Sequence, residues 1–168
     1  MLQKLQDYLP GVNLENLKLT ALINAYSALQ IPLLGFITPK VVDLTDSRSE
    51  VRVRLDRRTR NHLGVMYFGA LSMGAELSIA LKAIQTISKS GKKIDFLFKD
   101  FSAEFLKRAD GHVHFVCEQA GEVQDLIEHA ASTDERLNGT FEGFAFVPSK
   151  SPEPVMKYKL TLTVRRRG

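Results

Sequence analysis

The segment from about Phe68 to Lys89 constrains the fold more than any other part of this chain. Its apolar residues recur at 100° per residue, and such a broad stripe predicts a long helix that is buried on most sides. The members of the stripe are Ala70, Met73, Gly74, Leu77, Ala80, Leu81, Ile84 and Ile87. Gly91 is placed to end this helix, with Lys89, Lys92 and Lys93 near its negative pole.

A membrane-spanning helix is the first alternative for this region. From Asn61 to Leu81 the only charge is Glu76, and a span needs about 20 apolar residues. The same window also holds three glycines, an asparagine, a histidine and two serines, and a carboxylate in mid-membrane is costly. We therefore predict a buried helix whose single acidic residue, Glu76, has a functional role.

The segments around this helix read mostly as strands. A helix is predicted over 13–29, with Asn13 as its cap, Pro32 beyond its end, and a buried stripe of Leu14, Leu17, Ala21, Ala25 and Ala28. Residues 33–56 are strand-like, and the turn residues at 45–49 predict two antiparallel strands there. Alternating apolar residues predict four more strands at 94–107, 112–119, 139–147 and 155–166. Apolar residues that share one helical face predict a short helix at 122–131. Because the long helix is too apolar for exposure, the antiparallel sheet is expected to wrap it.

Length and composition limit the number of domains and the class of protein. A chain of 168 residues fits one domain spanning 1–168, and an apolar fraction of 44% excludes a disordered chain. The single cysteine excludes an intramolecular disulfide and a cysteine-based zinc site, which favours a reducing compartment. No apolar signal-peptide core follows the first residues, so a cytoplasmic location is expected.

The positive charges gather in two clusters. Residues 49–60 carry five arginines against one Glu and one Asp, and residues 157–167 carry Lys157, Lys159, Arg165, Arg166 and Arg167 without an acid. Such clusters suit a phosphorylated small molecule, nucleic acid or anionic lipid, although charge alone favours a solvated face.

A motif at the start of the long helix resembles a known family. Asn61, Gly64, Gly69 and Glu76 match in spacing the signature of phenylacetyl-CoA-type (PaaI-like) hotdog thioesterases, which has Asn, Gly, His-Gly-Gly and then an acid two turns later. Tyr67 and Phe68 stand where that family has its His and first Gly. The pattern is closest to an uncharacterised branch similar to the C-terminal domain of YiiD.

The resemblance implies an architecture. It is the α+β hotdog fold, a curled antiparallel sheet wrapped around a long central helix, covering residues 33–166. Residues 1–30 would form an N-terminal helical extension. Hotdog relatives assemble as homodimers or homotetramers with active sites at subunit interfaces, so a homo-oligomer is implied as well.

The resemblance also implies an acyl-CoA thioesterase, and it assigns roles to the motif. The backbone N–H of Phe68 or Gly69 would stabilise the oxyanion at the helix N-terminus, and Tyr67 would donate a hydrogen bond nearby. Glu76 would act as general base for water or as nucleophile, and Asn61 would orient water or substrate. The alternatives are a solvated acid on the helix flank for Glu76 and a turn residue for Asn61.

The remaining candidates concern phosphates, metals and other functions. Arg57, Arg58 and Arg60 precede the motif and would hold the phosphates of coenzyme A, for which Arg165–Arg167 are a second choice. Coenzyme A would be part of the substrate, and no bound cofactor or metal is expected: His112 and His114 lack a third ligand, and Cys117 lies in an apolar run. Other functions left open are a non-catalytic acyl-CoA binding or sensing protein and, third, a nucleic-acid binder that uses its Arg clusters.

Overall fold

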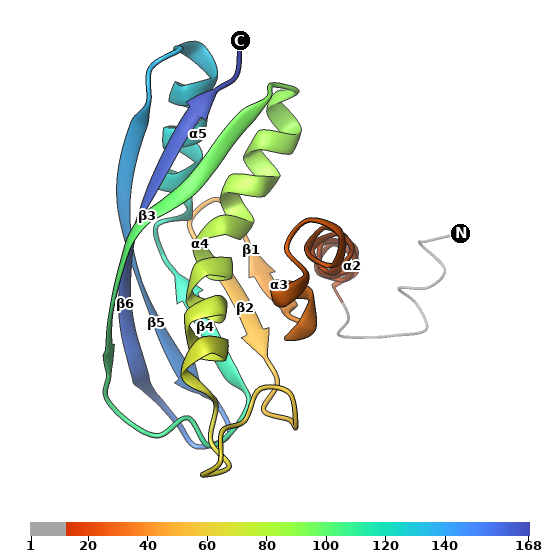
Figure 1. The fold of residues 1–168 in the computed structure, drawn as a ribbon, viewed down its shortest axis with the longest axis vertical. Coiled ribbons are helices and arrows are strands. Elements are labelled where there is room, and N and C mark those ends of the chain that lie inside the picture. The colour runs from red at the N-terminus through yellow and green to blue at the C-terminus, as the bar shows by residue number, and fades with distance from the viewer. Residues whose placement is uncertain (1–12) are drawn as a thin grey trace.

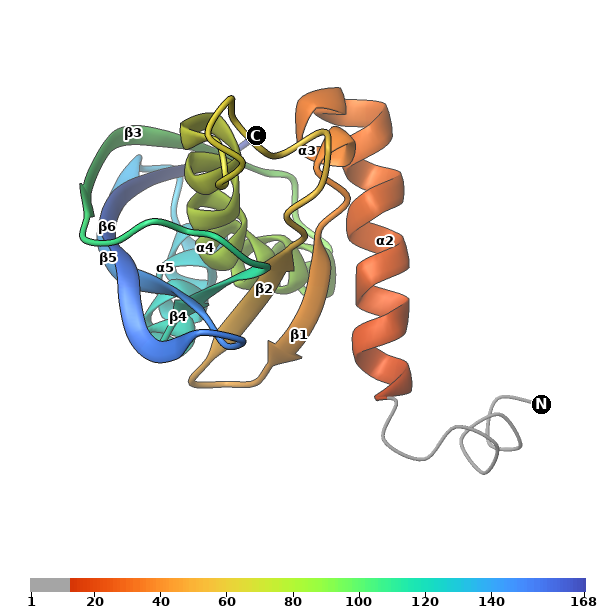
Figure 2. The same cartoon turned by 90° about the horizontal axis from the view of Figure 1, so that it is seen from below.

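A computed structural model describes residues 13–168 of the protein. A six-stranded antiparallel sheet in the order β1-β2-β4-β5-β6-β3 curls around the helix α4, Phe68–Ser90 (Figures 1 and 2). The strands are β1 (Lys40–Leu44), β2 (Ser49–Val53), β3 (Ile94–Phe105), β4 (Val113–Cys117), β5 (Leu137–Val147) and β6 (Ser151–Arg166). The other helices are α2 (Leu14–Gln30), α3 (Pro32–Phe36) and α5 (Ala120–Ser132). The predicted helix-in-sheet arrangement is confirmed.

The long helix α4 forms the centre of the core, as its apolar stripe predicts. Ala75, Ile79 and Ala83 are fully buried, and the helix ends at Gly91, which adopts the left-handed conformation with φ of 63°. Buried polar contacts also anchor it to the sheet. The hydroxyl oxygens of Ser78 and Tyr158 lie 2.7 Å apart, and Lys82 Nζ donates to the Thr45 carbonyl at 3.1 Å in the β1–β2 turn. No helix among residues 13–168 is long and apolar enough to cross a membrane.

The strand prediction over 33–56 is wrong at its beginning. Pro32–Phe36 form the short helix α3, and the first strand starts only at Lys40. Proline at the first position of a helix lacks only an N–H that would be unpaired there anyway, and its fixed φ suits a helix. A short apolar run such as residues 33–36 does not distinguish strand from helix by its period.

The predicted buried face of α2 is also wrong. The stripe from Leu14 to Ala28 points largely outward, and 47% of Leu17 is exposed. The inward face combines the buried Ile23 and Ser27 with the polar side chains of Asn16 and Thr20. The polar side chains are needed because α2 covers the edge of β1, where backbone groups have no neighbouring strand among residues 13–168. Asn16 Nδ2 donates to the Val42 carbonyl at 2.5 Å, and the Val41 N–H donates to Thr20 Oγ1 at 2.9 Å. Figure 2 shows α2 running alongside β1.

The two edges of the sheet therefore differ. The β1 edge is covered by α2, whereas β3 pairs with β6 on one side only and has no strand on the other among the described residues. The part of the expected N-terminal extension that precedes residue 13 lies outside the described residues.

Candidate functional site

The candidate site is built on the loop that leads from β2 to α4. Buried Thr59 organises this loop: its hydroxyl donates to the Arg54 carbonyl at 2.5 Å and accepts from the Asp56 N–H at 3.0 Å. The Thr59 carbonyl accepts from the Tyr67 N–H at 2.7 Å. These bonds fix the residue that precedes the helix, so the first turn of α4 has a defined position.

Asn61 shapes the turn inside this loop. Its Oδ1 accepts from the N–H groups of Leu63 at 2.9 Å and Val65 at 3.3 Å, and Gly64 supplies the positive φ of 77° that the turn requires. The turn role considered as an alternative for Asn61 is therefore present. Its Nδ2 has no hydrogen-bond acceptor among residues 13–168, so one donor of the side chain is still available.

The first turn of α4 has no cap. Tyr67 occupies the N-cap position and its side chain makes no capping hydrogen bond. Leu71 is the first residue of α4 whose N–H has an acceptor among the described residues: it donates to the Tyr67 carbonyl oxygen at 3.0 Å. Within the described part of the chain the N–H groups of Phe68, Gly69 and Ala70 have no acceptor. Three unpaired donors at the positive end of a 23-residue helix favour a negatively charged or polarised oxygen.

Aromatic rings flank these donors. The Tyr67 ring lies against Gly69, where an added Cβ would be 2.7 Å from Tyr67 Cε1. The Phe68 ring packs against Phe105 of β3, with the ring centroids 5.7 Å apart. Gly69 therefore leaves room for the ring of Tyr67.

Glu76 lies two turns further along α4, on the same side as Gly69. It is half-buried, and burial raises the pKa of its carboxyl group above the ordinary 4.5. It forms no ion pair or hydrogen bond with any residue of 13–168. Seven residues of helix separate Gly69 from Glu76, which corresponds to about 10 Å along the axis, and helical side chains lean toward the N-terminus. The helix thus presents unpaired donors and an unpaired carboxylate on one face.

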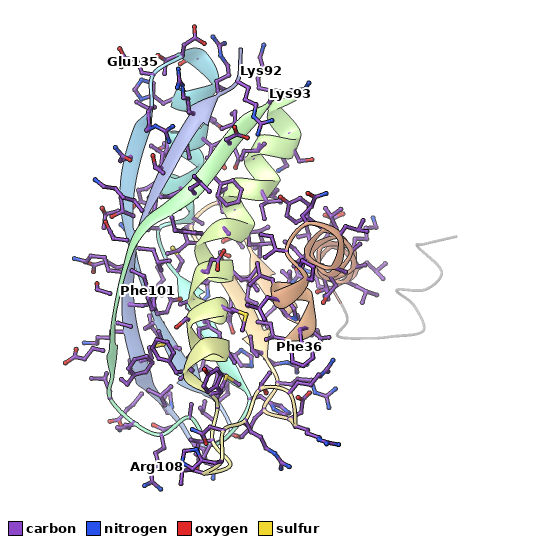
Figure 3. All side chains as sticks on the ribbon, viewed as in Figure 1. Phe36, Lys92, Lys93, Phe101, Arg108 and Glu135 are labelled. Atoms are coloured by element: carbon purple, nitrogen blue, oxygen red, sulfur yellow. The ribbon has the colours of Figure 1, made fainter. Side chains whose placement is uncertain are left out.

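The arginine cluster at this end is larger than the sequence indicates. Arg58 is engaged, because its Nη2 lies 3.3 Å from Asp56 Oδ2 and its guanidinium lies 5.9 Å from the centre of the Phe36 ring. Arg57 and Arg60 are exposed and form no ion pair among the described residues. The Met66 N–H donates to the Ala109 carbonyl at 2.9 Å, and this bond brings the exposed Arg108 to the same end (Figure 3). No local sequence signal connects Arg108 to the motif, because the two segments meet only through the fold.

The second cluster, Arg165–Arg167, lies at the other end of α4. The Arg167 N–H donates to the Lys93 carbonyl at 2.8 Å, just beyond the C-terminus of α4. The helix between the clusters is 23 residues long, about 35 Å. Within one chain, therefore, a single coenzyme A cannot engage both clusters with its phosphates.

Comparison with known proteins decides the family. Residues 20–138, more than two thirds of the chain, match the family described as a domain of unknown function, DUF4442. The chain belongs to the DUF4442 family. No curated protein matches it.

Solved structures share the fold of this DUF4442 chain at low sequence identity. A candidate thioesterase from Shewanella oneidensis superposes with a TM-score of 0.74 at 12% identity, covering 87% of this chain and 96% of that one. A thioesterase from Haemophilus influenzae gives 0.62 at 14%, with 86% and 88% covered. A protein of unknown function from Chlorobaculum tepidum gives 0.76 at 9%, with 90% and 97% covered. The predicted hotdog fold is confirmed.

The other titratable candidates of the DUF4442 chain have structural contacts. His112 Nδ1 accepts from the Leu55 N–H at 3.1 Å, and His114 Nδ1 lies 2.6 Å from Glu50 Oε1. No group of three or more metal-ligating side chains occurs within residues 13–168. Burial raises the pKa of the Cys117 thiol to about 11, so it is unreactive at neutral pH, as expected.

Proposed function

We propose that this DUF4442 chain hydrolyses acyl-coenzyme A thioesters at the N-terminus of α4. One observation carries the proposal: the unpaired N–H groups of the first turn and the half-buried, unpaired carboxylate of Glu76 share one face of the helix. Thioester hydrolysis needs both parts, a set of donors for the developing oxyanion and a base or nucleophile beside it. The fold shared with thioesterases supports the proposal.

In the proposed reaction the thioester carbonyl oxygen accepts hydrogen bonds from the Phe68 and Gly69 N–H groups. Glu76 removes a proton from a water molecule as that water attacks the carbonyl carbon. The tetrahedral intermediate then collapses, the carbon–sulfur bond breaks, and Glu76 returns the proton to the departing thiolate. The raised pKa of Glu76 suits both transfers, since a carboxylate that holds protons more tightly is a better base.

A nucleophilic role for Glu76 satisfies the same geometry. Its carboxylate would attack the carbonyl carbon directly, expel the coenzyme A thiolate and form an anhydride, which water then hydrolyses. In either course the Asn61 Nδ2 group is available to orient water or substrate, and the Tyr67 hydroxyl to donate a hydrogen bond nearby.

Coenzyme A would be bound through its phosphates by the arginines at this end of the molecule. Arg57 and Arg60 have no acidic partner among the described residues, and Arg108 joins them through the fold. Arg58 would contribute less, since Asp56 and Phe36 already hold its guanidinium.

A second copy of the chain would complete the site. The outer edge of β3 pairs with no strand of residues 13–168, so it can pair with a strand of another chain. Two of its phenylalanines are exposed next to α4, Phe101 at 38% and Phe105 at 47%. Apolar side chains on an unpaired edge strand favour association. We therefore propose a homodimer through β3, in which the partner covers the face of α4 that carries Glu76; a tetramer would add further contacts.

The experiment is a panel of acyl-CoA esters with detection of free thiol. We expect hydrolysis of at least one ester by the wild type and a loss of at least 100-fold with Glu76→Gln, in keeping with the ~10²–10⁴-fold contribution of a general base. Glu135→Gln makes the same chemical change at an exposed residue near the other end of the molecule and should retain full activity (Figure 3). A Glu76→Gln variant within a few-fold of wild type would refute the assignment.

A non-catalytic acyl-CoA binding protein is the second candidate. The specific observation in its favour is the Tyr67 ring, which lies against Gly69. Tyr67 and Phe68 stand where the thioesterase motif has its histidine and first glycine. Binding of a non-hydrolysable acyl-CoA analogue without thiol release from any ester would favour this function.

A further inference from the structure

The arginine cluster at the C-terminal end of β6 surrounds a cavity that the proposed reaction does not use. The cavity has a volume of about 350 Å³ and lies on the face of the sheet that points away from α4. Thr163 and Arg165 of β6 line it, together with Leu97 and Asp95 of β3 and Arg136, the residue before β5. The upper end of the molecule in Figure 3, where Lys92 and Lys93 are labelled, is the end that carries it.

The strand register sets two arginines directly opposite each other. Leu137, the first residue of β5, pairs with Val164 of β6. Continuing this antiparallel register by one residue brings Arg136, just before the strand, to Arg165, and both arginines line the cavity. Side chains at such positions are about 5 Å apart at their Cβ atoms, and like charges there are destabilising. Neither arginine forms an ion pair or a side-chain hydrogen bond with any of residues 13–168. An anion between them would remove the repulsion.

Two acids at this end of the molecule, Asp95 and Asp134, form ion pairs with other arginines. Asp95 faces Arg165 across the β3–β6 pair, but its Oδ2 accepts from Arg167 Nε at 2.5 Å. Asp134 Oδ1 accepts from Arg166 Nη2 at 2.5 Å. These two ion pairs hold Arg166 and Arg167 at the rim, and neither acid pairs with Arg136 or Arg165. Glu135 precedes Arg136 in the chain, but its exposed side chain forms no ion pair with any of residues 13–168.

A buried hydroxyl adds a polar contact to the cavity wall. Thr163 is only 8% exposed, and its Oγ1 has no hydrogen-bond partner among the described residues. Thr161, two residues earlier on the same face of β6, differs in this respect: its Oγ1 lies 2.8 Å from Oγ1 of Thr140 on β5. Across from Thr163 stands Asn138, and no bond joins them. A buried hydroxyl without a partner costs free energy unless a ligand or water satisfies it.

We propose that this cavity binds a phosphate-bearing small molecule, with a diphosphate or phosphomonoester group held between Arg136 and Arg165 and touching the Thr163 hydroxyl. A guanidinium presents a planar fork of donors that matches two phosphate oxygens at once, so two opposed arginines suit a diphosphate particularly well. The site does not depend on the proposed thioesterase function, because α4 separates it from the unpaired N–H groups of Phe68 and Gly69 in the same chain.

Inorganic pyrophosphate is the probe, titrated calorimetrically into the full-length protein at low ionic strength. We expect saturable binding at a site that depends on Arg136 and Arg165, and an increase in melting temperature. Arg136→Gln and Arg165→Gln should each raise the Kd at least tenfold, and Thr163→Val should raise it several-fold. Arg54→Gln, which removes the same charge at an exposed arginine near the opposite end of α4 and outside the proposed coenzyme A site, should leave the Kd within twofold.

A second measurement keeps the test independent of folding. Without pyrophosphate, Arg136→Gln should melt no lower than the wild type, because it relieves the repulsion from Arg165. Equal weakening by Arg54→Gln, or pyrophosphate binding that is unchanged in the Arg136 and Arg165 variants, would overturn the proposal. So would binding only to vesicles containing phosphatidic acid, or only to an oligonucleotide, without binding of free pyrophosphate.

Discussion

The ring of Phe115 on β4 fills the space that a side chain at Gly74 of α4 would need. A Cβ at Gly74 would lie 2.3 Å from Cε2 of Phe115 and closer than 2.7 Å to two further ring atoms. Both residues are buried, and Phe115 is one of the largest side chains with no exposed surface. This contact sets how closely the helix approaches the sheet, and thereby the position of the helix turns that carry Gly69 and Glu76.

Gly74→Ala should therefore destabilise the protein by about 1–3 kcal/mol through overpacking, even though alanine gains ~1 kcal/mol over glycine in a helix interior. Urea denaturation measures the difference. Adding Phe115→Leu to Gly74→Ala should recover part of the loss, whereas Ser72→Ala on the half-exposed side of α4 should have little effect. Unchanged stability of Gly74→Ala would mean that the helix and sheet do not pack this closely.

Glu76→Gln should raise the melting temperature at neutral pH. The pKa of Glu76 is raised in the folded state, so the folded protein binds its proton more tightly than the unfolded chain does. The stability that this proton provides is complete below the unfolded value near 4.5 and is lost as the pH rises through the folded pKa. The increase in melting temperature that Glu76→Gln causes should thus be present at pH 8 and shrink toward pH 4. A constant difference at all pH values would contradict burial of the charge.

Coenzyme A should bind more tightly than its 3′-dephospho form, because one phosphate contact with the arginines near the N-terminus of α4 is lost. Calorimetry at two salt concentrations measures this. Arg57→Gln and Arg60→Gln should each reduce the discrimination, and Arg165→Gln should not. Nucleic acid should bind weakly and lose affinity steeply with salt, as non-specific phosphate contacts do. Tight nucleic-acid binding at physiological salt would instead support the nucleic-acid function.

Light scattering should give at least a dimer at micromolar concentration. A lysine at Leu97, which is 65% exposed on β3, adds a charge to the free edge and should weaken the assembly. A lysine at Leu29, which is 81% exposed on α2, is the matched control and should leave a β3 dimer intact. A monomeric wild type, or a dimer that only the Leu29 change disrupts, would exclude the β3 interface.

Local patterns predicted most elements because each needs only its own residues. The helix over 68–89, the Asn13 cap and the β1–β2 pair follow from periodicity and turn chemistry, and Gly91 ends α4 in the left-handed conformation as expected. The buried face of α2 did not follow, because that face is chosen by the β1 edge: Asn16 and Thr20 turn inward to satisfy backbone groups that α2's own sequence does not reveal.

By itself the sequence determined that a long apolar helix lies inside a wrapped sheet, because a stripe as broad as that of α4 is stable only when covered on most sides. It also placed Asn61, Gly69 and Glu76 around one helix start, since their spacing is local. Only the tertiary structure decided that Arg108 joins Arg57 and Arg60, that Arg165–Arg167 lie at the opposite end, and that β3 has no second neighbouring strand among residues 13–168. These relations depend on which distant segments pair, and pairing is settled by the packing of the whole core.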